Sequence, residues 1–151
     1  EGGLDVAGGR EHLAGFVSRL KDAGIRVSLF IEPEERQIEA AAAIGADVVE
    51  LHTGAYCERA LQEDAKGVAY EVERLRNAAR IAAEAGLEVH AGHGLTYNTV
   101  APVARIPQVV ELNIGHFLIG EAIFGGLHSA VRRMRALMDE ARASVAGRRS
   151  A

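Results

Sequence analysis

The sequence predicts an α/β protein whose strands lie parallel in a single sheet. Short apolar runs alternate with longer segments in which apolar residues recur at helical spacing, as in a chain of βα units. Glycine follows three of these helical segments, where helices commonly end. Polar residues collect at the carboxyl ends of the apolar runs, where parallel α/β proteins build their sites. The four predicted strands are residues 26–31, 47–52, 87–91 and 109–114.

The helices follow from the same periodicity. Residues 10–23 carry Leu13 and Val17 one helical turn apart, and Gly24 follows as a terminating residue. Residues 53–57 are expected to form a loop after the second strand. The other predicted helices are residues 34–44, 63–85, 97–104, 117–124 and 127–144.

Four βα units of this length form half of a (β/α)8 TIM barrel. The alternation of strands and helices favours right-handed crossovers between parallel neighbours. An open doubly wound sheet is the structural alternative. No G-x-G-x-x-G motif opens a helix, which disfavours a dinucleotide-binding fold.

Composition excludes several classes of protein. The chain has 151 residues, enough for one domain, and its net charge of −4 gives no footprint for nucleic acid. No apolar run is long enough to span a membrane, and the start shows no signal-peptide pattern. Cys57 is the single cysteine, which rules out an internal disulfide and indicates a reducing compartment. We therefore expect a cytoplasmic protein with neither nucleic acid nor membrane as partner.

One domain is expected over residues 1–145, followed by a disordered basic tail at residues 146–151. The sequence begins at Glu1, without methionine and inside a glycine-rich stretch. From this beginning we expect a piece of a longer protein.

A histidine bracketed by glycines follows the third strand. Gly92 and Gly94 flank His93, and Thr96 is the expected N-cap of the next helix. Glycines at these positions permit positive φ and close approach of the backbone to a ligand, so a small substrate could reach His93. The alternative is a tight βα turn with an incidental histidine.

Other polar residues also fall near strand ends. Glu50 and His52 are two residues apart on the second strand and should face the same side, as should Glu111 and Asn113 on the fourth. In a barrel these ends share one rim.

Each of these residues has a structural alternative. Glu50 could pair with a neighbouring arginine, and Asn113 could cap a loop. His52 and His90 are interpreted as structural histidines satisfied by hydrogen bonds. No H-x-x-x-H or H-x-H spacing fixes two ligands on one element, so no metal site is predicted.

The helix that follows Gly115 and His116 is a candidate anion site. Backbone N–H groups of Gly115, His116 and Phe117 could hold a phosphate, assisted by the helix dipole. Barrels that use phosphorylated substrates often bind the phosphate after their last two strands.

Five segments together resemble the carboxyl-terminal part of the pyridoxine 5′-phosphate synthase family, PdxJ. No single segment is decisive, but their order and intervals are specific. The segments are residues 1–8 (EGGLDVAG), 27–31 (VSLFI), 50–54 (ELHTG), 91–97 (AGHGLTY) and 111–116 (ELNIGH).

This resemblance implies a (β/α)8 barrel with added helices that assembles as a homo-oligomer, of which this chain holds strands five to eight. The implied activity is that of a transferase acting on small phosphorylated substrates. It condenses 1-deoxy-D-xylulose 5-phosphate with 3-amino-2-oxopropyl phosphate, giving pyridoxine 5′-phosphate, phosphate and water in vitamin B6 biosynthesis. The resemblance implies no metal and no organic cofactor.

The resemblance also implies roles for individual residues. His93 matches the family's proton donor, and Glu50 matches the glutamate that stabilises the transition state. Gly94, Gly115 and His116 match positions that contact substrate or product, the last two near a phosphate. The family's other acid–base residues lie on earlier strands, so the 151 residues alone are expected to be inactive.

Two other functions compete with this one. A different phosphate-binding barrel is possible, but an aldolase would need a strand-end lysine, and the only lysines, Lys21 and Lys66, fall on predicted helices. The non-catalytic alternative is a half-barrel remnant that binds a phosphorylated metabolite or a partner subunit.

Overall fold

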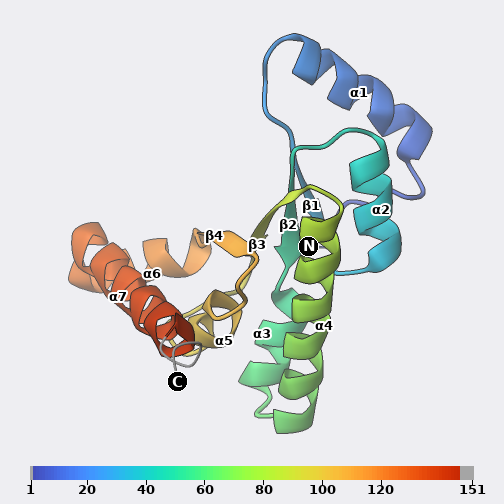
Figure 1. Cartoon of the computed structure of the whole chain (residues 1–151). Coiled ribbons are helices and arrows are strands. Elements are labelled where there is room, and N and C mark those ends of the chain that lie inside the picture. The colour runs from blue at the N-terminus through green and yellow to red at the C-terminus, as the bar shows by residue number, and fades with distance from the viewer. Residues whose placement is uncertain (1, 147–151) are drawn as a thin grey trace.

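The structure is a computed structural model, and it describes residues 2–146. Its four strands are all parallel and lie in the order β1-β2-β3-β4 (Figure 1). Each crossover therefore leads to the neighbouring strand, with no reversal of strand order in this sheet of the kind that doubly wound sheets contain. The strands are β1 (Ser28–Ile31), β2 (Val48–His52), β3 (Glu88–Gly92) and β4 (Val109–Asn113).

Helices separate the strands as the periodicity predicted, and the four predicted strands are confirmed to within about two residues at each end. Gly24, Gly45 and Gly86 each follow a helix with φ between +75° and +85°, which confirms their role in ending helices. The helices are α1 (Arg10–Asp22), α2 (Glu35–Ala43), α3 (Gly54–Leu61), α4 (Ala65–Glu84), α5 (Val100–Ala104), α6 (His116–Gly125) and α7 (Leu127–Ala146).

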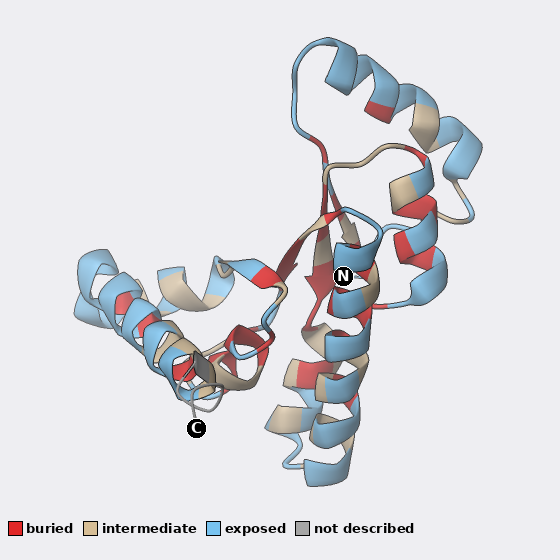
Figure 2. Ribbon diagram, in the orientation of Figure 1, coloured by how far each residue is buried: buried red, intermediate tan, exposed pale blue. Residues whose placement is uncertain are grey.

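The two faces of the sheet differ in chemistry because side chains alternate along a strand. Leu29, Val49, Leu51 and Val89 point to one face and are buried in the core with residues of α2 and α4. Figure 2 shows buried residues along the strands and on the sides of these helices. The other face carries a mostly polar set, which is Phe30, Glu50, His52, His90, Glu111 and Asn113.

A bulge in β4 aligns this polar face. Val89 pairs with Val109, but the next residue, His90, pairs with Glu111. Val110 is therefore the extra residue, and it is exposed. Without the bulge, Val109 would share a face with Glu111. The expectation that Glu111 and Asn113 face the same side of the sheet is confirmed.

The predicted loop at residues 53–57 is wrong. Gly54–Leu61 forms α3, which was not predicted because this helix has only eight residues, begins with glycine and buries only Tyr56 fully. The helix predicted over residues 63–85 begins later, at Ala65, where the Asp64 carboxylate accepts from the N–H of Gly67 at 3.0 Å and caps α4. Glu63, with φ of +55°, makes the break between the two helices.

The helix predicted over residues 97–104 starts three residues late. Thr96 donates its N–H to the hydroxyl oxygen of Thr99 at 2.8 Å, so residues 97–99 form a turn and Thr99 occupies the N-cap position of α5. The expected tail is wrong at Ala146, which is the last residue of α7. Residues 147–151 of that tail lie outside the described residues.

Across residues 2–146, no helix is both long and apolar enough to cross a membrane. The most exposed apolar side chains of the carboxyl-terminal region lie on and beside α6. None of the residues of this helix is buried. The exposed set in this region is Ile119, Ile123, Phe124, Leu127 and Val131.

The first prediction concerns the apolar face. Leu51→Ala is expected to lower the free energy of unfolding by about 2–5 kcal/mol, because Leu51 is fully buried and its removal leaves a cavity. Leu61→Ala, the same change at a side chain that is 85% exposed, should cost less than about 0.5 kcal/mol. Urea unfolding of both variants checks this pair, and equal losses would contradict the assignment of the core.

Candidate active site

The predicted site residues come together around one pocket. It has a volume of about 640 Å³ and lies where β2, β3 and β4 end. All five predicted residues, Glu50, His93, Gly94, Gly115 and His116, line it. The remaining lining residues are Phe30, Leu95, Thr96, Asn113, Ile114 and Phe117.

Glu50 is fixed by the neighbouring parts of the sheet. Its Oε2 accepts a hydrogen bond of 2.7 Å from the side-chain amide of Asn113 on β4. Gly92 lies on β3, between β2 and β4. A Cβ added at Gly92 would be 2.3 Å from Glu50 Oε1 and 2.7 Å from the backbone oxygen of Asn113. The carboxylate therefore crosses β3 only because Gly92 has no side chain. Neither structural alternative is observed: the partner of Glu50 is Asn113 and not an arginine, and Asn113 bonds to Glu50 instead of capping a loop.

His93 is held in an unusual backbone conformation. Its φ is +81°, a region that non-glycine residues rarely adopt and that costs free energy. Gly94 has φ of +80°, as expected, whereas Gly92 is not among the residues with positive φ. Gly92 thus serves close packing, and the histidine itself takes the strained position.

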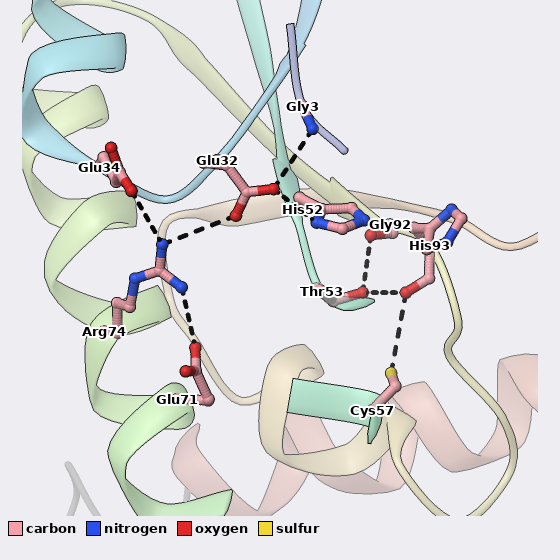
Figure 3. Close-up of polar contacts among 10 residues, drawn as sticks. All are labelled: Gly3, Glu32, Glu34, His52, Thr53, Cys57, Glu71, Arg74, Gly92 and His93. Atoms are coloured by element: carbon pink, nitrogen blue, oxygen red, sulfur yellow. Dashed lines mark hydrogen bonds and ion pairs between the residues drawn. The ribbon is translucent and has the colours of Figure 1, made fainter. Parts of the chain in front are cut away.

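The loop that carries His93 is anchored by its backbone oxygens (Figure 3). The hydroxyl of Thr53 lies 2.7 Å from the oxygen of Gly92 and 2.5 Å from that of His93. The thiol of Cys57 donates to the oxygen of His93 at 3.7 Å. Burial raises the pKa of the Cys57 thiol, which keeps it protonated as a donor at neutral pH. These contacts explain how the strained conformation is maintained.

Tyr56 ties α3 to the segment after β3. Its hydroxyl donates to the backbone oxygen of Thr99 at 2.8 Å, and burial raises the pKa of Tyr56 to about 12. Tyr56 therefore remains a neutral donor at physiological pH, and α3 is locked against the loop that carries His93.

The start of α6 faces the same pocket. Gly115 is its N-cap residue, and Gly115, His116 and Phe117 line the pocket. The first N–H groups of a helix have no partner within it, and the helix dipole favours an anion there. The three residues of the predicted phosphate site therefore lie together at the pocket wall.

The two histidines interpreted as structural differ from each other. His90 is 6% exposed and contacts Glu88 at 2.7 Å through Nε2 and Glu111 at 3.5 Å through Nδ1. That satisfied arrangement confirms the structural interpretation of His90. His52 contacts Glu32 at 2.9 Å through Nδ1, but its buried Nε2 has no hydrogen-bond partner within the described residues, so the interpretation is wrong for that atom.

Sequence reasoning missed Thr53, Glu32 and the packing role of Gly92. Thr53 follows the last residue of β2, where a hydroxyl can reach the next loop, and this position was the one available signal.

Over residues 2–146, no group of three or more histidine, cysteine, aspartate or glutamate residues is arranged to hold a metal ion.

The fold and the site define a protein of parallel βα units with a pocket at the carboxyl ends of its strands. The family described as "Pyridoxal phosphate biosynthesis protein PdxJ" matches residues 1–140, and the chain belongs to this family. The resemblance found from the five segments is confirmed.

Proteins similar to this chain carry the name pyridoxine 5′-phosphate synthase. That of Rhodospirillum rubrum is 64% identical over 143 residues, which cover 93% of this chain and 55% of the relative. That of Caulobacter sp. strain K31 is 60% identical over 146 residues, covering 97% and 58%. That of Jannaschia sp. is 61% identical over 142 residues, covering 94% and 57%. The chain thus spans a little over half the length of these relatives.

The second prediction tests the crossing of Glu50 over β3. Gly92→Ala should lower the free energy of unfolding by about 1–3 kcal/mol, because the new Cβ meets the backbone of β4 and forces a shift. It should also break the bond between Glu50 and Asn113, visible as a change in the Asn113 side-chain amide signals in NMR. Gly15→Ala is the matched control, since an added Cβ there meets nothing within 4 Å and lies inside a helix. This control should be neutral or stabilising; an equally tolerated Gly92→Ala would contradict the packing account.

Proposed function

We propose that this chain provides the carboxyl-terminal part of a pyridoxine 5′-phosphate synthase, a transferase of vitamin B6 biosynthesis. The reaction condenses 1-deoxy-D-xylulose 5-phosphate with 3-amino-2-oxopropyl phosphate to pyridoxine 5′-phosphate, phosphate and water. The observation that carries this proposal is the shared pocket, in which three strand ends deliver Glu50, His93 and the Gly115–His116 pair. Relatives with this name at about 60% identity support it.

The four strands are, in this proposal, strands five to eight of a (β/α)8 barrel, of which residues 1–145 form a partial domain. Their consecutive parallel order supports this assignment, as does the polar face, which would line the interior of the barrel at its catalytic end. Such an interior needs the remaining strands to close it. The proposed protein contains them, and we expect it to lie in the cytoplasm, as the single cysteine suggests.

His93 is proposed to give the proton needed when imine formation and ring closure release water. Histidine suits this step because it titrates near neutral pH. Its position on the pocket wall, on a loop locked by Thr53 and Cys57, would hold the ring near the reacting atoms. Effective positioning of this kind lowers the entropic part of the barrier.

Glu50 is proposed to stabilise cationic imine intermediates. A carboxylate in a partly buried site attracts a developing positive charge more strongly than it would in water. The bond from Asn113 occupies Oε2 and leaves the orientation of the carboxylate fixed before substrate arrives. The phosphate of a substrate would lie against the N–H groups at Gly115 and His116, with Gly94 also contacting substrate.

Self-association is also part of the proposal. The exposed apolar residues around α6, of which Ile123 is 79% and Phe124 91% exposed, form a surface of the kind that subunit interfaces cover. We therefore expect a homo-oligomer. A non-catalytic half-barrel that binds a phosphorylated metabolite or a partner subunit is the alternative function.

The third prediction separates the enzyme from its isolated part. The 151 residues alone should give no pyridoxine 5′-phosphate, because the proposed reaction also needs acid–base groups from early strands. The complete protein should turn over under the same assay. Measurable ring formation by the 151 residues alone would contradict the need for those strands, and an inactive complete protein would favour the remnant.

The fourth prediction concerns the proton donor. In the complete protein, His93→Asn should lower kcat by about 10²–10⁴-fold with KM changed by less than about threefold, since proton transfer and not binding is lost. His12→Asn on the exposed surface of α1 is the matched control and should leave both constants unchanged. Steady-state kinetics decides, and unchanged turnover in His93→Asn would remove this residue from the role.

A further inference from the structure

The two ring nitrogens of His52 lie in different surroundings. The residue is 9% exposed, and its Nδ1 lies 2.9 Å from Glu32 Oε1. Its Nε2 is buried and has no hydrogen-bond partner among residues 2–146. Burying a polar atom without a partner costs free energy, so a purely structural residue at this position would be better served by an apolar ring.

Glu32 is itself held in place, as Figure 3 shows. Its Oε1 also accepts the backbone N–H of Gly3 at 3.3 Å, and its Oε2 lies 3.6 Å from the guanidinium of Arg74 on α4. Arg74 additionally contacts Glu34 at 3.5 Å and Glu71 at 3.1 Å. A carboxylate fixed from both sides can only accept, so His52 donates from Nδ1. In the neutral ring, Nε2 is then the unprotonated nitrogen.

The ring of His52 rests against that of His93. Their centroids are 4.8 Å apart with planes tilted by 44°, and the Phe30 ring meets His52 edge-on at 4.9 Å. A Cβ added at Gly54 would lie 2.8 Å from His52 Nε2 and 3.3 Å from His93 Cδ2. The two imidazoles therefore meet beside a glycine that leaves room for both.

We propose that Glu32 and His52 form a positioning pair for His93. Glu32 fixes the tautomer and the rotation of the His52 ring, and that ring supports one face of the His93 ring at the pocket wall. Burying Nε2 without a partner lowers stability, and in return His52 provides a polar ring of fixed orientation beside His93. This positioning role rests on the proposed function of His93. The contacts among Glu32, His52 and His93 are independent of that function.

The structure offers a matched control in His90. This histidine is also buried, lies on the same face of the sheet and pairs with a carboxylate, but both of its ring nitrogens have partners. Replacing His90 with phenylalanine removes two contacts, whereas the same change at His52 removes one contact, that with Glu32, together with the unsatisfied nitrogen. His52→Phe should therefore cost less stability and more rate than His90→Phe.

The test in the complete protein compares His52→Phe with His90→Phe. His52→Phe should melt later than His90→Phe, yet lose about tenfold or more in kcat with KM changed less than about twofold, because the orientation of His93 is lost while substrate binding is kept. His90→Phe should melt earlier and keep its kcat. An unchanged kcat in His52→Phe, or equal losses in both variants, would overturn the proposal.

Two further measurements keep the test decisive. If His52→Phe does not fold, Glu32→Ala should produce the same fall in kcat at constant KM, and unchanged kcat there overturns the pair. In the ¹⁵N-histidine-labelled 151-residue chain near pH 8, nitrogen shifts should show His52 with the proton on Nδ1; a proton on Nε2 would also overturn it. An unsubstituted complete protein without synthase activity would count against the proposed function alone, because the tautomer is read without turnover.

Discussion

The sidedness of the sheet is the constraint on which the rest of the structure depends. Alternation along each strand places Leu29, Val49, Leu51 and Val89 in the core and leaves the opposite face to Glu50 and its polar neighbours. Because the strands are parallel, their carboxyl ends lie together, and one pocket collects side chains from three of them. A one-residue change of register in any strand would exchange the two faces. The bulge at Val110 preserves the register of the polar face in β4.

Within the candidate site, small residues matter as much as Glu50 and His93. Gly92 lets the Glu50 carboxylate reach Asn113 across β3, and Gly54 lets two imidazoles meet. The strained backbone of His93 is retained because Thr53 holds its carbonyl oxygen. The polar side chains of the pocket are therefore oriented by small neighbours, as a preorganised site would require.

Much of this arrangement could be predicted from the sequence. Apolar runs and glycine stops gave the four strands and most helices, because these patterns are local. The gathering of Glu50, His93 and His116 in one pocket followed from strand parallelism. The helix α3 could not be predicted, since it has only eight residues, begins with glycine and fully buries only Tyr56. The contact between Glu32 and His52 joins residues twenty positions apart through side-chain geometry that no spacing rule encodes.

The central claim is that Glu50, His93 and the start of α6 surround one bound substrate. A crystal structure of the complete protein with 3-amino-2-oxopropyl phosphate tests it most directly. The account predicts the phosphate within hydrogen-bonding distance of the Gly115 and His116 N–H groups, with the organic part between Glu50 and His93. A phosphate bound elsewhere, or a ligand that touches neither Glu50 nor His93, would contradict the account.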